Sequence, residues 1–552
     1  MTTPLTNIIE YSPLAKYLCQ RFAKNSEDIT FLQAFSAIEA ALTAGNTVAE
    51  LKQPLRESSS LIITDSQAQA GQIAPVVTDN KRLWLHKTWI EEYTLANAIF
   101  KRIHIPIQPL STELSTYFKK NSAETIHARP EQIQAIKHAA THAFTLITGG
   151  PGTGKTYTIA QLVAALIQTT PHIHIALAAP TGKAAKRMDE SLHHALKKSL
   201  KESQLAEAQI EEAQTLHRLL GLGFNQISKY HQQNPLPYDL IIIDEASMLS
   251  LTLARQLFEA VSSKSKLILL GDADQLAAVE PGAVLHDISQ HPIMQSAICS
   301  LKQSQRFANH SGIGQLAEKI LAPESNNIDT LEQLFKQHDD ISYQIPDRDF
   351  YTKLAQPYQN YFDALKSQTI SEKPDKLFSY FDDYRILCAS KHKAFGTKAI
   401  NNQLKHIHCR ILGYSVDSPY FHGLPLMLCE NDYTNNLFNG DIGICLMIEK
   451  ELGIYFPDRT NPIPLTRLNL QALEIAYALT IHKSQGSEYQ HIALTFDPSQ
   501  NQGLTRELLY TGITRAKHKL TLYTSPQLLA EIAQTPTQRT TGLATFIDKL
   551  GD

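Results

Sequence analysis

The chain has 552 residues, of which 43% are hydrophobic and 19% are charged, and its formal net charge is −3. This composition excludes a fibrous, a disordered and a strongly basic protein, so any surface for a polyanion must be a local groove. A chain of this length is too long for one hydrophobic core, and we expect about three or four domains.

The cysteines and the N-terminus indicate the compartment. The six cysteines are scattered, and no two of them have the C-x-x-C spacing of zinc and redox sites. We interpret them as core thiols in a reducing environment. The first residues lack the basic and apolar regions of a secretion signal, and no run of about 18 apolar residues occurs. We therefore expect a cytoplasmic protein with no membrane contact.

Residues 1–125 have an irregular, helical pattern. In "TFLQAFSAIEAALTAG" the apolar residues recur every three or four positions, which favours amphipathic helices. The segment contains both tryptophans of the chain, Trp84 and Trp89, but no pattern with an evident chemistry. We predict a helical N-terminal domain over 1–125.

From about residue 126 the pattern changes to short apolar runs that end in polar loops. These runs predict buried parallel strands, each followed by a helix: "TLITGG", "HIALAAP", "LIIIDE" and "KLILLGD". We place them in a first α/β domain over 126–300. The first run leads into a P-loop pattern, whose glycines let backbone N–H groups turn toward a phosphate chain at a helix N-terminus. The predicted nucleotide-binding residues are Gly149, Gly150, Pro151, Gly152, Thr153, Gly154, Lys155 and Thr156.

Lys155 and Thr156 have distinct expected roles. Lys155 would reach the β and γ phosphates of a nucleotide, and the Thr156 hydroxyl would take one coordination position on magnesium. Nucleotide binding alone does not decide nucleotide use, because kinases, transporters, GTPases and motors share this loop.

Two later strand ends carry further polar side chains. "LIIIDEASM" ends in Asp244 and Glu245, at the edge where open α/β sheets bind their ligands. We predict that Asp244 holds magnesium through water and that Glu245 orients and deprotonates an attacking water. Gln275, in "GDADQ" after the next strand, would contact the γ-phosphate or that water.

A second α/β domain is predicted over 301–552 from the runs "YRILCAS", "HIALTF" and "KLTLYTS". Within it, "GLPLMLCEND" and "NGDIGICLMIEK" predict antiparallel strands, and we place a small β-rich insertion at 411–470. Residues 320–380 show no clear pattern. The predicted fold class is α/β, with a cleft between two α/β domains.

The ordered series of patterns along the chain resembles a known family. These patterns are similar to the motifs of superfamily-one DNA helicases. In chain order they are "GGPGTGKT", "APTGKAAKRM", "TLHRLLG", "DEASM", "GDADQL", "ALTIHKSQGSEY" and "LLYTGITRAK". "APTGKAAKRM" and "HKSQGSEY" are typical of the RecD group, the alpha subunits of the RecBCD helicase–nuclease, exonuclease V. The resemblance runs from about residue 128 to the C-terminus and implies two RecA-like P-loop NTPase domains.

The resemblance implies further site residues. Gln132 would contact adenine, and Arg306 and Arg515 would be arginine fingers that the second domain supplies to the phosphates. For DNA, the candidates are polar residues at strand ends that suit contacts to a sugar–phosphate backbone. These are Thr181, Lys183, Thr480, His482 and Ser484. A structural role for His482 remains an alternative.

The resulting interpretation is an ATP- and magnesium-dependent 5′-to-3′ translocase on single-stranded DNA. The resemblance places it in a heterotrimer with RecB-like and RecC-like subunits, which acts on duplex ends in double-strand-break repair by homologous recombination and in DNA degradation. The N-terminal domain would then dock a partner, with its tryptophans either in that interface or in its own core. Two alternatives are a standalone RecD-like helicase and a regulatory subunit that binds ATP without being a motor. No nuclease chemistry is expected in this chain.

Overall fold

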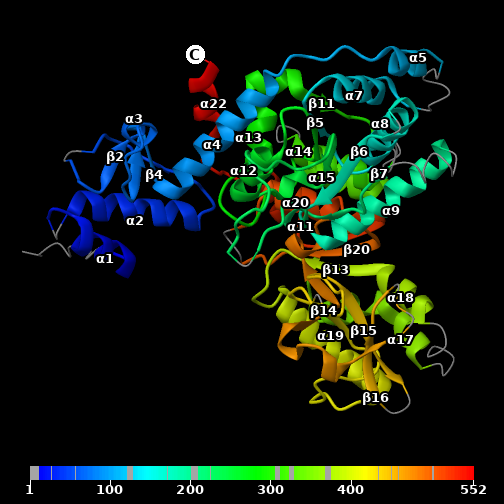
Figure 1. The fold of residues 1–552 in the computed structure, drawn as a ribbon. Coiled ribbons are helices and arrows are strands. Elements are labelled where there is room, and N and C mark those ends of the chain that lie inside the picture. Colours follow the sequence, from blue (N-terminus) through cyan, green and yellow to red (C-terminus); the bar gives the residue numbers. More distant parts are fainter. Residues whose placement is uncertain are drawn as a thin grey trace, which may run out of the picture.

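The computed structural model describes residues 11–25, 28–55, 58–120, 128–170, 172–200, 209–223, 225–304, 311–322, 328–366, 374–432, 434–448, 451–457, 459, 461–499 and 503–551. An N-terminal lobe is followed by two α/β domains, and an antiparallel β insertion interrupts the second of them (Figure 1). Within these ranges, no helix combines the length and the apolar character needed to cross a membrane.

The N-terminal lobe contains a sheet as well as helices. Its four strands are in the order β1-β4-β3-β2, a sheet that the prediction of a helical domain did not include. These strands have only two to four residues each, too few for an alternating pattern to be recognised. The elements are α1 (Pro13–Phe22), α2 (Ile29–Thr43), β1 (Ala49–Glu50), β2 (Ile62–Thr64), α3 (Asp65–Gln69), β3 (Val76–Thr78) and β4 (Arg82–Leu85).

The next helix, α4 (His86–Ile103), belongs to the core of the first α/β domain as much as to the lobe. It packs against α12 (Leu251–Ala260) and against the last helix, α22 (Leu543–Gly551). Trp84 and Trp89 are 0% and 3% exposed and lie in the same hydrophobic cluster as these helices. They therefore fill an internal core and are not exposed for contact with another protein.

The first α/β domain is built on a parallel sheet of order β11-β5-β10-β9-β6-β7, with β8 also paired to β6. Its strands are β5 (Phe144–Thr148), β6 (His174–Ala179), β7 (Gln209–Ile210), β8 (Gln214–Thr215), β9 (Leu240–Ile243), β10 (Lys266–Gly271) and β11 (Ile298–Ser300). Besides α12, its helices are α5 (Thr112–Lys120), α7 (Pro130–Thr141), α8 (Lys155–Thr169), α9 (Gly182–Ser199), α11 (Leu216–Leu219) and α13 (Val284–Gln290).

The second α/β domain has a parallel sheet of order β12-β21-β20-β13-β19. Its strands are β12 (Ile341–Gln344), β13 (Tyr384–Cys388), β19 (Ala478–Thr480), β20 (Tyr489–Thr495) and β21 (Ala516–Tyr523). Its helices are α14 (Gly312–Leu321), α15 (Ile328–Gln337), α16 (Phe350–Ala355), α17 (Gln359–Leu365), α18 (Pro374–Asp382), α19 (Thr397–Leu412), α20 (Arg506–Ile513) and α21 (Pro526–Ala533). The fold class is therefore α/β, as expected.

The β insertion is an antiparallel sheet of order β17-β16-β15-β14-β18. It begins at Pro425 and ends at Ile475, later at both ends than the predicted 411–470, because α19 continues to Leu412 and β18 returns beside β14. It lies beyond β13, away from the first sheet (Figure 1). Its strands are β14 (Pro425–Leu428), β15 (Ile442–Ile448), β16 (Glu451–Tyr455), β17 (Ile463–Pro464) and β18 (Leu473–Ile475).

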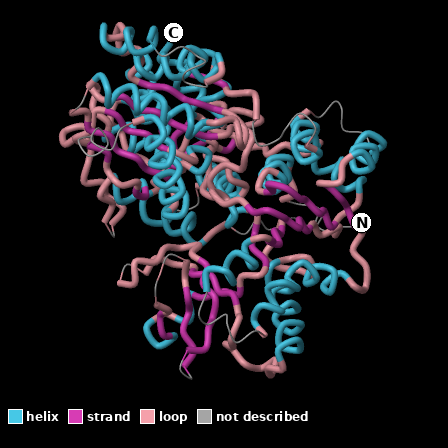
Figure 2. Tube along the Cα trace, turned by 90° about the vertical axis from the view of Figure 1, so that its right-hand side faces the viewer, coloured by secondary structure: helices cyan, strands magenta, loops and turns pink. Residues whose placement is uncertain are grey.

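The C-terminal tail leaves the second α/β domain, contrary to the predicted boundary at 552. The Arg539 guanidinium donates to the carbonyls of Ala278 and Gly282, at 2.8 and 2.6 Å, and Gly542 N donates to Glu92. Helix α22 then packs beside α4 and α13, and Figure 2 shows the C-terminus at the far end of the molecule from the β insertion. The tail therefore ties the lobe to the first α/β domain.

Candidate functional site

The loop between β5 and α8 has the backbone geometry that the P-loop pattern requires. Gly152 and Gly154 have φ of 76° and 87°, a region that residues with a side chain rarely adopt. A Cβ atom placed on Gly149 would lie 2.5 Å from the carbonyl oxygen of Leu301. The glycines are therefore needed for the path of this loop, and α8 begins directly after it, at Lys155.

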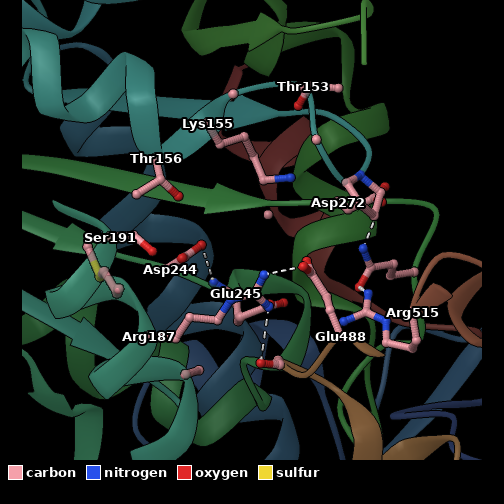
Figure 3. A pocket seen from close by; sticks show the side chains of 18 residues that line it. Thr153, Lys155, Thr156, Arg187, Ser191, Asp244, Glu245, Asp272, Glu488 and Arg515 are labelled. Carbon is pink, nitrogen blue, oxygen red and sulfur yellow. Dashed lines mark hydrogen bonds and ion pairs between the residues drawn. The ribbon is translucent and has the colours of Figure 1, made fainter. Parts of the chain in front are cut away.

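Lys155 folds back over the loop, where its ammonium donates to the carbonyls of Gly149 and Gly150. The loop lines a cavity of about 190 Å³, together with Thr156 and residues from the next strand ends. Figure 3 shows Lys155, Thr156, Asp244 and Glu245 around this hollow. N–H groups at a helix N-terminus, an ammonium and a hydroxyl form an environment for a phosphate chain.

Asp244 and Glu245 follow β9 and line the same cavity. Glu245 has φ 51° and ψ 42°, a left-handed conformation that costs about 1 kcal/mol or more for a residue other than glycine. Its N–H donates to Asp244 Oδ1 at 2.8 Å. Burial raises the pKa of Asp244, and the neighbouring Glu245 carboxylate raises it further, while Lys155 and Arg187 oppose this. The pair places two carboxylates beside the loop.

Gln275 lies in a buried network that joins the two α/β domains. Its Nε2 donates to Asp272 Oδ2 at 2.9 Å, and its Oε1 accepts from Arg515 at 2.8 Å. The Tyr510 hydroxyl also donates to Asp272 Oδ2, at 3.1 Å. Arg515 comes from the second α/β domain and lines the cavity. The predicted residues Gln275 and Arg515 are thus in direct contact, and Asp272, which was not predicted as a site residue, holds the Gln275 amide.

Arg187 and Glu488 form a second bridge across the cavity, and neither was predicted as a site residue. The guanidinium of Arg187, on α9, makes an ion pair with Glu488, which precedes β20 (Figure 3). Arg187 also donates to the carbonyl of Gly486 at 3.4 Å. Arg187 is three residues after Ala184 and four before Ser191 on α9, and all three line the cavity, so they share one face of this helix.

The sequence predicts that Gln132 and Arg306 contact the nucleotide, and the structure describes only Gln132 of the two. Gln132 is buried at the start of α7, and its amide contacts the chain's own backbone, with Oε1 accepting from Arg129 N at 3.0 Å and Nε2 donating to Thr153 O at 3.3 Å. It supports the loop in this conformation and is not among the residues that line the cavity. Arg306 lies outside the described residues.

The predicted DNA contacts lie at the ends of β6 and β19. Thr181 caps α9 by accepting from Ala184 N at 3.2 Å, and the Lys183 ammonium lies 5.9 Å from the ring centre of Tyr489, across the domain boundary. Thr480 accepts from Lys483 N at 3.3 Å, and His482 is exposed. Ser484 is 0% exposed and donates to Ile481 O at 2.7 Å, so its side chain does not face solvent in this conformation.

The donor set of the cavity fits a nucleotide phosphate chain with magnesium. The Thr156 hydroxyl and the Asp244 carboxylate are hard oxygen ligands on one wall, and Lys155 supplies positive charge. Among the described residues, no group of three or more His, Cys, Asp or Glu side chains forms a separate metal site. The site therefore has the groups needed to bind and cleave a phosphoanhydride, with Arg515 on the opposite wall.

Comparison with known proteins gives consistent matches. Residues 132–281 match the AAA domain family, and residues 475–523 match the UvrD-like helicase C-terminal domain family. The chain is 31% identical to the RecBCD enzyme subunit RecD of Haemophilus influenzae, over 88% of this chain and 83% of that protein. It is 29% identical to the ATP-dependent RecD2 DNA helicase of Deinococcus radiodurans, over 70% of this chain but 48% of that protein. A solved structure of Bacteroides Pif1 bound to ssDNA has 19% identity and a TM-score of 0.40, covering 72% of this chain and 93% of that one.

Proposed function

Because the chain belongs to the RecD family of RecBCD enzyme subunits, we propose that it is an ATP-dependent 5′-to-3′ DNA helicase that translocates on single-stranded DNA. The observation that carries the proposal is the shared cavity: the P-loop, Asp244 and Glu245 come from the first α/β domain, and Glu488 and Arg515 come from the second. A site with walls on two domains is completed only when they close, so phosphate cleavage there is coupled to domain motion.

Each residue has a role that follows from its position. Lys155 and the loop N–H groups would hold the phosphates, and Thr156 and Asp244 would hold magnesium, which would supply positive charge to neutralise the phosphates. Glu245 accepts a proton from the attacking water, and Gln275 positions that water. Arg515 stabilises the charge that develops on the transferred phosphoryl group.

The partners follow from the family. The named relative is a subunit of the RecBCD enzyme, and we assign this chain to a complex with RecB-like and RecC-like subunits that acts on duplex ends. Its role there is double-strand-break repair by homologous recombination and DNA degradation. The outer face of α1 supports a docking role for the N-terminal lobe, because Leu14, Tyr17 and Phe22 are 54%, 58% and 59% exposed.

The two alternatives are less well supported. The chain spans 83% of the RecD subunit of Haemophilus influenzae and 48% of the RecD2 helicase, so its match with the subunit is the more complete of the two. A regulatory subunit that only binds ATP needs neither the carboxylate of Glu245 nor the guanidinium of Arg515, yet both line the cavity.

Displacement of streptavidin from biotinylated single strands tests the direction of movement. With ATP, the purified chain should displace streptavidin from a 3′ biotin and leave a 5′ biotin bound, and Glu245→Gln should displace neither. Displacement from the 5′ end would reverse the proposed polarity.

Co-expression with RecB-like and RecC-like subunits tests the docking role. Tyr17→Glu should lose co-purification and keep the ATPase of the isolated chain, whereas Lys16→Glu, at an exposed neighbouring position, is the matched control. Co-purification of Tyr17→Glu at the wild-type ratio would exclude this face of α1.

A further inference from the structure

Two lysines and one glutamate form a joined ion-pair group at the edge of the second α/β domain. Lys391 follows β13, and Lys483 follows β19, which is the parallel neighbour of β13. Lys391 Nζ lies 2.8 Å from Glu474 Oε1, and Lys483 Nζ lies 3.0 Å from Glu474 Oε2. Glu474 belongs to β18 of the insertion, so one carboxylate from the insertion contacts two lysines of the α/β domain.

The two lysines surround the Glu474 carboxylate as a binding site surrounds an anion. Each carboxylate oxygen has its own ammonium, and the two positive charges exceed the one negative charge. Burial opposes ionisation of Glu474, but the hydrogen bonds and charges of Lys391 and Lys483 lower its pKa to about 2. The carboxylate is therefore ionised at every pH at which the protein works.

The ion-pair group is exposed enough for another anion to replace the Glu474 carboxylate. The side chains of Lys391, Lys483 and Glu474 are 43%, 36% and 40% exposed, and ion pairs this exposed contribute little net stability. A second anion can therefore reach the lysines from solvent and replace the carboxylate without disrupting a buried core.

The position of the group identifies the anion. Lys483 N donates to Thr480 Oγ1 at 3.3 Å, and Thr480 is a proposed DNA contact. Resting on the DNA-binding function proposed above, we propose that Lys391 and Lys483 together bind one backbone phosphate of single-stranded DNA, and that Glu474 occupies this site until the phosphate displaces it. Glu474 is then an internal competitor that weakens DNA binding.

A second contact of the insertion supports this arrangement. Phe438 packs on Gly182 at the start of α9, where an added Cβ atom would lie 2.9 Å from the ring. Burial raises the pKa of the nearby Asp441, and the charges of Lys183 and Lys186 oppose that rise. The insertion therefore places carboxylates near lysines of both α/β domains.

The test measures the affinity of the full chain for a fluorescent oligothymidylate by anisotropy. Glu474→Gln removes the competing charge and keeps the size of the side chain, so it should bind about two- to fivefold more tightly at low salt. Glu451→Gln, an exposed neutralisation on β16 of the same insertion, should match the wild type. The difference should disappear in a Lys391→Gln/Lys483→Gln background, where no phosphate site remains.

The outcomes separate this inference from the proposed function. If the wild type does not bind the oligonucleotide at all, the DNA-binding function itself fails. If the wild type binds and Glu474→Gln binds equally or more weakly, the internal-competitor inference is wrong and the group only fastens the insertion. Equal tightening without the two lysines would also overturn it, because the effect would then be general charge repulsion.

Discussion

The guanidinium of Arg515 donates a 2.8 Å hydrogen bond to Gln275 Oε1, and this contact joins the second α/β domain to the first. The Arg515 side chain is 3% exposed, and its Nε also donates to Thr511 O at 3.2 Å. It is thus held at the wall of the cavity by fixed partners. This placement is the reason for the proposal that Arg515 couples domain motion to cleavage.

Arg515→Ala should lower DNA-stimulated ATPase by about 10³-fold or more and leave DNA affinity close to that of the wild type. Arginine fingers contribute about 10³–10⁵ in rate, because they stabilise transition-state charge. Arg515→Lys keeps the positive charge but loses the planar guanidinium that can donate two parallel hydrogen bonds, so it should recover only part of the ATPase rate. Loss of DNA affinity, with normal turnover at saturating DNA, would make Arg515 a DNA contact instead.

Lys155→Ala and Glu245→Gln should separate nucleotide binding from hydrolysis. Lys155→Ala removes the phosphate contact and should abolish turnover and weaken binding of ATP, whereas Glu245→Gln should bind ATP normally and not hydrolyse it. Fluorescent-nucleotide titration and steady-state ATPase measure the two properties. Glu190→Gln, at an exposed position on α9, is the control that should behave as the wild type. Substantial turnover by Glu245→Gln would remove Glu245 as the base.

Asp287→Asn should stabilise the protein above neutral pH. Burial raises the pKa of Asp287 from 3.8 to about 7, although the Thr541 hydroxyl donates to it at 2.7 Å. A carboxyl whose pKa is raised by folding favours the folded state when protonated, so that stability is lost as the pH rises from about 4 to 7. The variant removes a cost of about 1–3 kcal/mol at pH 8.

The measurement for Asp287 is the difference in Tm between the variant and the wild type at two pH values. The variant should melt higher at pH 8, and the difference should shrink at pH 5. An equal difference at both values would show that the carboxyl titrates normally in the folded state.

Arg102→Ala should destabilise the protein by about 2–4 kcal/mol. The side chain is 5% exposed and donates to the carbonyls of Val261, Ser262 and Ser265, at 2.6, 2.9 and 3.0 Å. Its removal leaves buried acceptors without a partner. Lys101→Ala, at the exposed neighbouring position, should change stability by less than about 0.5 kcal/mol in denaturant titration. Similar midpoints for the two variants would contradict the role of α4 in the core.

The parts of the site that could be predicted are those encoded in one short segment. The P-loop and the pair Asp244 and Glu245 each lie where a buried strand ends, so local pattern was enough to find them. The bridge between Arg187 and Glu488 was not found, because it joins residues about 300 positions apart, and sequence spacing carries no information on such contacts.

The same reason explains the differences in the fold. In the N-terminal lobe, β1 pairs with β4, which is not its neighbour in sequence, and the strands are too short to show alternating apolar and polar residues. Helix α22 contacts α4 only because the chain returns to the first α/β domain. The tryptophans show the limit of composition, since aromatic residues suit an interface and a core equally, and only the packing of α4 places Trp84 and Trp89 inside.

Steady-state ATPase of the purified full chain, with and without single-stranded DNA, tests the central claim most directly. We propose that domain closure on the DNA strand brings Arg515 to the phosphates, and turnover should then rise by at least about tenfold with saturating oligothymidylate. The rise should be absent in Glu245→Gln. A chain that binds ATP and single-stranded DNA but hydrolyses ATP at the same rate with and without DNA would contradict the proposal that it is a motor.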